Sequence, residues 1–301
     1  MLPADFALVD AHHHLWDLRD ARHPWLHEDA SEAFFLGNYS AIKQNYFPAD
    51  YQRDSAGLGV VKTVHCEAEW ARDDQVGETR WLTEINARFG MPHAIVAHAW
   101  FHTDDSADVL RAHANFPLVR GIRSKPVTAP SPQTMRRGIA GSMTDPRWRA
   151  GYARLAEHGF SWDLRVPYWH LYEAADVVAA HPEIPVVLNH TGFPWDRSPV
   201  GLAAWRDAMR AIAQHSHVHL KVSELGLPDA PWDRDSNQIV VRDAIEIFGV
   251  ERCMFASNFP VAGLRVSYAD LVHDMVHMTS HLSDRKQRAF FHDNATAFYR
   301  L

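Results

Sequence analysis

Short apolar segments recur along the chain, and most are followed by a longer stretch in which apolar residues return every three or four positions. Such short segments have the length of strands, and a nearly continuous apolar run such as Ile184–Leu188 is typical of a strand buried on both faces. The strands predicted in this way are Leu8–Ala11, Val60–Cys66, Ala94–Ala99, Leu118–Ile122, Ser161–Val166, Pro185–Leu188, Val218–Val222 and Arg252–Ala256.

The stretches between these strands have the pattern of amphipathic helices, most clearly at Gln75–Phe89, Leu171–Ala180, Ala203–Ala213 and Asn237–Phe248. Strands that alternate with helices predict an α/β fold with a parallel sheet. Eight repeats without a glycine-rich dinucleotide fingerprint favour a closed (β/α)8 TIM barrel over an open sheet. We expect residues 1–301 to form a single barrel domain.

Three long irregular segments follow predicted strands: Asp17–Tyr46 after the first, Arg123–Thr144 after the fourth and Pro228–Ser236 after the seventh. Loops that follow barrel strands lie at the carboxyl end of the barrel, where TIM-barrel enzymes carry their active sites. We therefore expect these long loops to build the site. The final segment, Ser283–Leu301, has the pattern of one or two helices that close the barrel.

The charge of the chain narrows the range of partners. The chain has 30 Lys and Arg residues and 37 Asp and Glu residues, a net charge of −7 with histidine neutral. This balance does not suit nucleic acid or an anionic membrane, so we expect a small-molecule substrate. Without a signal-peptide pattern or an apolar run long enough to cross a bilayer, we expect a cytoplasmic protein. The two cysteines, Cys66 and Cys253, fall in predicted strands and are expected to be buried free thiols.

Two histidines stand at the end of the first predicted strand. Because side chains alternate along a strand, His12 and His14 point to the same side and His13 points away. Two imidazoles on one face can hold a divalent metal ion or orient a polarised substrate. The alternative is a histidine cluster packed beneath a loop, but the position at a strand end, after Asp10, favours a functional pair.

Two further candidates stand at the ends of later strands. His190 leaves the sixth strand and enters a glycine turn, where it faces the mouth of the barrel or, alternatively, is hydrogen-bonded in the core. Asn258 ends the eighth strand, where the alternative is an ordinary turn residue. Together with His12 and His14, His190 brings three imidazoles from two strands to one end of the predicted barrel.

These segments resemble the amidohydrolase superfamily over almost the whole chain. Asp10–Trp16 is similar to the Asp-x-His-x-His opening of that family. The other similar segments are Arg120–Arg123 on strand four, Leu188–Gly192 on strand six, Leu220–Ser223 on strand seven, Ser257–Pro260 on strand eight and the closing Asn294–Leu301. The similarity is greatest to the branch of amidohydrolase family 2 that contains fuconolactonase-like sugar lactonases and the pyrone-dicarboxylate lactonase.

The resemblance implies hydrolysis of a lactone or related carboxylic ester by water that attacks the carbonyl carbon. In relatives, an aspartate at the end of strand eight is the general base or a metal ligand, whereas this chain has Asn258. A carboxylate can accept a proton from water and a carboxamide cannot. We therefore expect a histidine, such as His12 or His190, or else Glu67, to accept the proton. The alternative for Glu67 is an exposed loop carboxylate.

The metal content is open at this point. Either one divalent ion, such as Zn²⁺, is held by His12, His14 and His190 with a water in the open position, or the site needs no metal, as the resemblance to some lactonases implies. Two-metal members of the superfamily need further ligands on strands four and five. There this chain offers Arg123 and Asp163 and no histidine.

Cations and aromatic residues at strand ends are candidates for substrate binding. Arg123, Arg165 and Lys221 end strands four, five and seven, where they suit a carboxylate or a developing oxyanion. Pairing with a nearby acid is the alternative for each. Trp16 and Trp70 suit a sugar ring or an aromatic acid, and core packing explains such residues equally well. The expected substrate carries a carboxylate or hydroxyl groups.

Three functions fit this pattern. The first is hydrolysis of a lactone of a sugar acid or of an aromatic-degradation intermediate. The second is a decarboxylase or hydratase on the same scaffold, because one fold serves several reactions. The third is a non-catalytic barrel that binds a small acid, which Asn258 makes credible. The presence of all three histidines favours catalysis over binding.

Overall fold

Eight parallel strands form one sheet in which each strand pairs with its neighbours in chain order. The computed structural model describes residues 2, 6–27, 34 and 36–301. The strands are β1 (Leu8–His13), β2 (Val60–Cys66), β3 (Ala94–Ala97), β4 (Val119–Ile122), β5 (Ser161–Leu164), β6 (Val186–Leu188), β7 (Val218–Val222) and β8 (Cys253–Phe255). β3 and β5 end earlier than predicted, because the next residues leave the sheet and bring His98 and Arg165 to the cavity at the mouth of the barrel.

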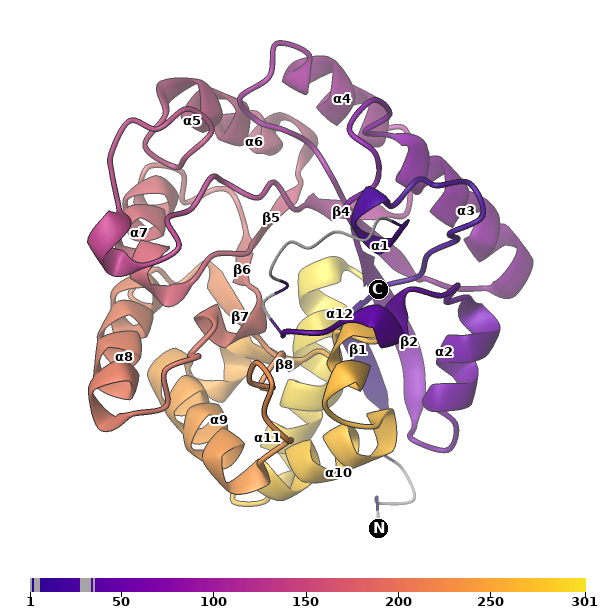
Figure 1. The fold of residues 1–301 in the computed structure, drawn as a ribbon, viewed down its shortest axis with the longest axis vertical. Coiled ribbons are helices and arrows are strands. Elements are labelled where there is room, and N and C mark those ends of the chain that lie inside the picture. Colours follow the sequence, from indigo (N-terminus) through magenta and orange to yellow (C-terminus); the bar gives the residue numbers. More distant parts are fainter. Residues whose placement is uncertain (1, 3–5, 28–33, 35) are drawn as a thin grey trace.

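Backbone contacts between the first and last strands close the sheet. The amide of Asn258 donates to the carbonyl of His12 at 2.7 Å, and the amide of His14 donates to the carbonyl of Phe259 at 2.7 Å. A parallel bridge also joins His13 to Phe259. The predicted (β/α)8 barrel is therefore confirmed (Figure 1).

Most of the helices form a ring outside the strands, whereas α1 (Pro24–His27) lies in the loop after β1 and α12 (Asn294–Tyr299) lies under the barrel interior (Figure 1). The other helices are α2 (Pro48–Asp54), α3 (Gly77–Phe89), α4 (Ser106–His113), α5 (Pro146–Ala153), α6 (Leu155–His158), α7 (Leu171–Ala179), α8 (Pro199–Ala213), α9 (Arg234–Phe248), α10 (Tyr268–Met278) and α11 (Asp284–Arg288). α8 and α9 begin earlier than predicted, because the side chains of Ser198 and Asp233 accept hydrogen bonds from amides of the first turn and cap each helix.

The predicted closing segment is helical and covers the end of the barrel formed by the amino ends of the strands. α11 is joined to α12 by a π-helical turn, Ala289–Asp293. Ala295 and Tyr299 of α12 pack in the small apolar core inside the barrel, whereas a larger core lies mainly between the strands and the outer helices. Arg120, near the start of β4, donates from Nε to the carbonyl of Tyr299 at 3.0 Å. α12 therefore lies at the amino ends of the strands, opposite the predicted site.

The long loops predicted after β1 and β4 contain short turns. The loop after β1 holds α1 and a 3₁₀ turn, Ser40–Ile42, and part of the predicted segment Asp17–Tyr46 lies outside the described residues. The loop after β4 holds a 3₁₀ turn, Pro132–Thr134.

Two expectations about the chain as a whole can also be compared with the structure. Both cysteines are buried and free, as expected. Among the described helices, none has the length and apolar character needed to cross a membrane.

Candidate active site

The histidines of the first strand alternate as predicted. The ring centroid of His12 lies 5.0 Å from that of His14 and 4.7 Å from that of His190. His13 points to the other side, where its ring lies 4.6 Å from that of Tyr51. The structure therefore brings the three predicted imidazoles together at the carboxyl end of the barrel.

Asp10 fixes the position of β1 against the end of β8. Its carboxylate is fully buried and accepts hydrogen bonds from the amide and hydroxyl of Ser257, at 2.9 and 2.6 Å. It also accepts from the hydroxyls of Tyr51 at 2.7 Å and Tyr268 at 3.1 Å. Because Ser257 precedes Asn258, this network positions the strand end that carries Asn258.

The ring of His14 is held in one tautomer. Its Nδ1 lies 2.7 Å from the carbonyl oxygen of Cys66, which can only accept a hydrogen bond. Nδ1 therefore carries the proton, and Nε2 carries the lone pair when the ring is neutral. His190 is less constrained, because its Nδ1 lies 3.1 Å from the hydroxyl of Ser223, which can donate or accept.

Burial and nearby cations keep the three imidazoles neutral. Burial lowers the pKa of each ring well below its usual value. The strongest neighbouring charges, which lower the three pKa values further, are Lys221 for His12, Arg123 for His14 and Arg165 for His190. A neutral imidazole can accept a proton from water, so each ring is in the state that a general base requires.

Arg123 and Glu67 form a buried ion pair beside the imidazoles. Nε of Arg123 donates to Oε1 of Glu67 at 2.6 Å, Nη2 donates to the carbonyl of Glu67, and Nη1 lies 3.4 Å from Nε2 of His12. Burial opposes ionisation of Glu67, but the charges of Arg123 and Lys125 outweigh it and hold the pKa of that carboxyl well below its usual value. The second carboxylate oxygen accepts from the amide of Glu69 at 2.8 Å. Both oxygens of Glu67 are thus engaged, which fits orientation of Arg123 better than the predicted role of base.

Two residues predicted to bind substrate lie beneath the site instead. Lys221 is fully buried, with its Nζ 2.5 Å from Oδ2 of Asp163 and 3.5 Å from Nδ1 of His12. Trp16 is also fully buried, and its ring stacks on that of His14 at 6.2 Å between centroids. Side chains without exposed surface have no face for a substrate. Lys221 and Trp16 therefore support the histidines, and their burial does not favour the predicted direct contact with a substrate.

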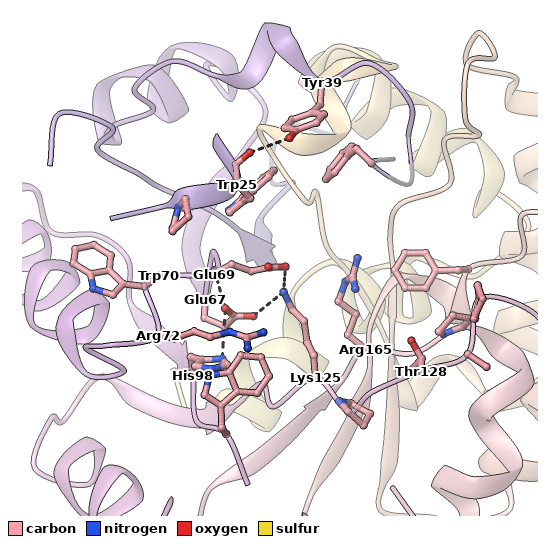
Figure 2. Close-up of a pocket in the computed structure, with 18 of the residues that line it drawn as sticks. Trp25, Tyr39, Glu67, Glu69, Trp70, Arg72, His98, Lys125, Thr128 and Arg165 are labelled. Atoms are coloured by element: carbon pink, nitrogen blue, oxygen red, sulfur yellow. Dashed lines mark hydrogen bonds and ion pairs between the residues drawn. The ribbon is translucent and has the colours of Figure 1, made fainter. Parts of the chain in front are cut away.

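A cavity of about 830 Å³ lies at the mouth of the barrel and is called here the outer cavity (Figure 2). Its walls are rich in aromatic rings, which come from Trp25, Phe34, Tyr39, Trp70, Trp100, Trp169, Phe193 and Trp195. An inner pocket of about 50 Å³ shares several of its lining residues with the outer cavity and reaches His14, His190, Asn258 and Arg123. The predicted binding residues Trp70 and Arg165 thus line the outer cavity, and Arg123 lines the inner pocket.

Charged side chains meet where the outer cavity joins the inner pocket. Figure 2 shows Lys125 and Arg165 directed into this space, with Glu67 and Glu69 beside the ammonium group. Nζ of Lys125 forms ion pairs with Glu69 and, at 3.3 Å, with Glu67. The guanidinium of Arg165 lies 5.1 Å from the ring centroid of Phe193.

Glu224 is a buried acid that the sequence analysis did not single out. It stands two residues after β7, is 5 % exposed, and accepts a hydrogen bond at Oε2 from Nδ2 of Asn258. Burial raises the pKa of Glu224 to about 7. Glu224 could have been found from the sequence by its position just after the seventh predicted strand, at the same end of the barrel as His14.

The donor atoms of the site do not fit a divalent metal ion. Within the described part of the chain, the donors that lie within 4.8 Å of one another belong to His12, Cys66 and Asp163, and the three predicted imidazole ligands form no such group. Burial raises the pKa of the Cys66 thiol to about 12, and Asp163 already binds the ammonium of Lys221. His12 faces Lys221 at Nδ1 and Arg123 at Nε2, so a divalent cation would meet two positive charges.

The closed barrel, with imidazoles and cations at the carboxyl ends of its strands, defines the architecture of a TIM-barrel enzyme. The chain belongs to the amidohydrolase family, whose model matches residues 9–301. The predicted family is thus confirmed, and proteins of both predicted branches are among the matches.

Three relatives illustrate the range of the family. The chain is 37 % identical to the uncharacterized protein y4mH of Sinorhizobium fredii, over 99 % of this chain and 100 % of that protein. It is 25 % identical to an L-fucono-1,5-lactonase of Burkholderia ambifaria, over 87 % of this chain and 83 % of the lactonase. A crystal structure of an amidohydrolase from Burkholderia multivorans with bound zinc has the same fold, with a TM-score of 0.80, 24 % identity and coverage of 98 % of this chain and 100 % of that one.

Proposed function

We propose that this protein hydrolyses a lactone that carries a carboxylate, at the inner pocket. One observation carries the proposal: the neutral imidazoles of His14 and His190 line this pocket together with the cations Arg123, Lys125 and Arg165. A base and an anion-binding group at one small pocket are what the attack of water on an ester requires. The similarity to L-fucono-1,5-lactonases supports a cyclic ester over an open one.

We assign the proton acceptor to His14, because its tautomer leaves the lone pair on Nε2. In this reaction the oxygen of water bonds to the carbonyl carbon of the lactone, and the water proton passes to Nε2. The ring C–O bond then breaks, and the ring oxygen takes the proton back to become a hydroxyl group. The product is a hydroxy acid, whose carboxyl group releases one proton to the solvent near neutral pH.

Arg123 is the group best placed to stabilise the oxyanion. Glu67 engages its Nε and Nη2, so the guanidinium is held in place before the substrate arrives. Nη1, beside His12, remains to donate to the negative charge that develops on the carbonyl oxygen. Donors held in position in a buried site stabilise such a charge at little reorganisation cost.

The cavity indicates what the rest of the substrate is like. Lys125 and Arg165, at the junction of the outer cavity and the inner pocket, suit the carboxylate of the substrate. The aromatic walls of the outer cavity suit a flat or pyranose ring. A sugar-acid 1,5-lactone and an unsaturated cyclic ester with a carboxylate both meet these requirements.

A panel containing both kinds of lactone, followed with a pH indicator, tests the proposal. We expect the protein to release acid from at least one of them, and His14→Asn to lower kcat/KM by about 10²- to 10⁴-fold. His281→Asn, the same change at an exposed histidine, should leave the rate unchanged. Release of CO₂ from carboxylate substrates would show a decarboxylase instead, and binding without turnover would show a binding protein. Either result would overturn the proposal.

A further inference from the structure

Asn258 connects His14 to a buried acid. Its Oδ1 lies 3.0 Å from Nε2 of His14, and its Nδ2 donates a hydrogen bond to Oε2 of Glu224. Each of the three residues is at most 5 % exposed. The side chains therefore form a continuous buried chain from the inner pocket to Glu224.

In this orientation of Asn258, an acceptor faces an acceptor when His14 is neutral. Nδ1 of His14 donates to the carbonyl of Cys66, so the lone pair of Nε2 points at Oδ1 of Asn258. The contact becomes a hydrogen bond only when Nε2 gains a proton. Asn258 thus increases the affinity of His14 for a proton, as a base requires.

The orientation of the amide depends on the charge of Glu224. An ionised carboxylate can only accept, so it draws the NH₂ group of Asn258 and leaves Oδ1 toward His14. A neutral acid can donate its O–H to Oδ1 instead. The amide then turns its NH₂ group toward Nε2 of His14 and occupies the lone pair that would take the proton.

Two further observations indicate that the side chain of Glu224 has a function. Its φ of 52° lies in the left-handed region, where residues other than glycine, asparagine and aspartate are uncommon. In the described part of the protein, its buried Oε1 has no hydrogen-bond partner. Strained backbone and buried unpaired polar atoms both lower stability, and both concentrate at functional sites.

We propose that Glu224 is a positioning residue that acts through Asn258 to make His14 the base of the reaction. In its ionised form Glu224 holds the amide with Oδ1 toward His14, and the imidazolium formed when water loses its proton then donates to that oxygen. The proton stays on Nε2 and does not cross the amide. Glu224 thus supplies, at a second position, the carboxylate that position 258 lacks. This inference rests on the proposed hydrolysis.

The proposal predicts how the rate depends on pH. Burial raises the pKa of Glu224 to about 7, against the opposing effect of its hydrogen bond with Asn258 and of the charges of Arg165 and Arg265. The imidazoles stay neutral in this range because their pKa values are lowered. Below its pKa Glu224 is neutral and the NH₂ group of Asn258 donates to Nε2 of His14, whereas above it Nε2 faces Oδ1 of Asn258 and its lone pair receives no hydrogen bond. Activity should therefore rise with pH through about 7 and level off above it.

Glu224→Gln removes the titrating group and keeps the size of the side chain. We expect the rise near pH 7 to disappear and kcat at pH 8 to fall by roughly 100-fold, the lower end of what a positioned base contributes. KM should change little, because Glu224 is buried behind Asn258. Glu224→Asp keeps a carboxylate and should keep the rise, at a lower rate. A Glu224→Gln variant with the wild-type rate and pH profile would overturn the proposal.

A matched control exchanges the carboxylate and the amide between the two positions. Asn258→Asp combined with Glu224→Gln places a carboxylate directly against Nε2 of His14 and an amide behind it. We expect the double variant to recover most of the kcat that Glu224→Gln loses. The single variant Asn258→Asp is measured as well. If the loss of kcat in the double variant equals the sum of the losses in Glu224→Gln and Asn258→Asp, on a free-energy scale, the two residues act independently and the proposal is wrong.

The ring nitrogens of His14 give a readout that does not depend on hydrolysis. In protein labelled with ¹⁵N-histidine, the Nε2 signal of His14 should show a titration step near pH 7 that is absent in Glu224→Gln. If the step is present and no lactone is hydrolysed, the proposed function fails and the coupling of Glu224 to His14 stands. If wild-type protein lacks the step, the role of Glu224 is refuted whatever the activity.

Discussion

At the scale of single residues, charged groups of the site occur as pairs contributed by different strands. Glu67, directly after β2, orients Arg123, directly after β4. Asp163 on β5 holds Lys221 of β7 beneath His12, at 2.5 Å. In each pair a buried carboxylate holds a cation that faces His12.

Glu67→Gln should destabilise the protein far more than Glu69→Gln. Glu67 is 1 % exposed, and its replacement leaves the guanidinium of Arg123 buried without a counter-charge, which costs about 3–5 kcal/mol. Glu69 is exposed, so its ion pair with Lys125 contributes at most about 1 kcal/mol. Denaturant unfolding of both variants at pH 7 measures the difference.

The difference in stability between wild type and Glu67→Gln should depend on pH, in a direction that the lowered pKa of Glu67 fixes. The pKa of Glu67 is lowered by folding, so its pair with Arg123 stabilises the protein above the unfolded-state pKa of the carboxyl. This stabilisation is lost as the pH falls through the lower, folded-state pKa. The gap in stability between wild type and Glu67→Gln should therefore narrow in acid. Equal stability of the two at pH 7 would contradict the pairing.

The sequence predicts which residues stand at strand ends but not how deep they lie. His12, His14 and His190 could be found because each ends a strand, and the structure places all three together. Lys221 also stands near a strand end, yet it is the fourth residue of the five in β7 and points into the barrel below the mouth. Alternation along a strand gives the side on which a residue lies and not its height along the barrel, so the sequence could not show that Lys221 lies below the mouth.

At the scale of elements, the contact between β1 and the end of β8, called here the seam, depends on one carboxylate. Asp10 accepts hydrogen bonds from Ser257, which follows β8, from Tyr51 of α2, from Tyr268 of α10 and from the amide of His12 in its own strand. These donors around one buried acid hold the end of β8 and two helices against β1. The seam also carries Asn258, so its stability affects the geometry of the site.

Asp10→Asn should weaken this seam. The amide can accept at one atom only, and its NH₂ group meets donors, so at least one buried partner is left unsatisfied at a cost of about 2–4 kcal/mol. Tyr268→Phe removes a single hydrogen bond of 3.1 Å and should cost about 1 kcal/mol. Thermal or denaturant unfolding compares the two variants, and equal losses would show that Asp10 is not the centre of the network.

The strands and helices could largely be predicted from the sequence, whereas the contacts that close the barrel could not. The predicted bounds of β2 and β7 match the observed ones, and those of the other strands differ by one or two residues at an end, because buried apolar runs mark strands well. The starts of α8 and α9 were placed too late, although Ser198 and Asp233 are capping residues visible in the sequence. No local pattern tells that Asp10 binds Ser257, since the contact joins residues 247 positions apart.

At the scale of the whole molecule, the barrel interior places positive charge around His12. Arg123 lies on one side of the ring and Lys221 on the other. Each of these cations is also paired with a buried carboxylate, Arg123 with Glu67 and Lys221 with Asp163. The positive charge beside His12 opposes the binding of a further cation there.

Protein purified without a histidine tag should accordingly retain its activity after chelation. We expect metal analysis by mass spectrometry to find much less than one divalent ion per chain, because a cation near His12 would be repelled by two charges. Addition of Zn²⁺ should not raise the rate. One tightly bound zinc per chain, whose removal abolishes activity and whose return restores it, would refute this expectation.

The position of α12 has a consequence for synthesis on the ribosome. The hydroxyl of Tyr299 donates to Asp163 at 3.1 Å, and Asp163 holds the lysine beneath His12. His12 and His14 are synthesised early, yet the contacts beneath them are complete only when α12, which is synthesised much later, packs against the barrel. A nascent chain stalled before Ala289 would contain all the residues that line the inner pocket above an open barrel. Such a chain should be inactive until the last helix emerges and docks.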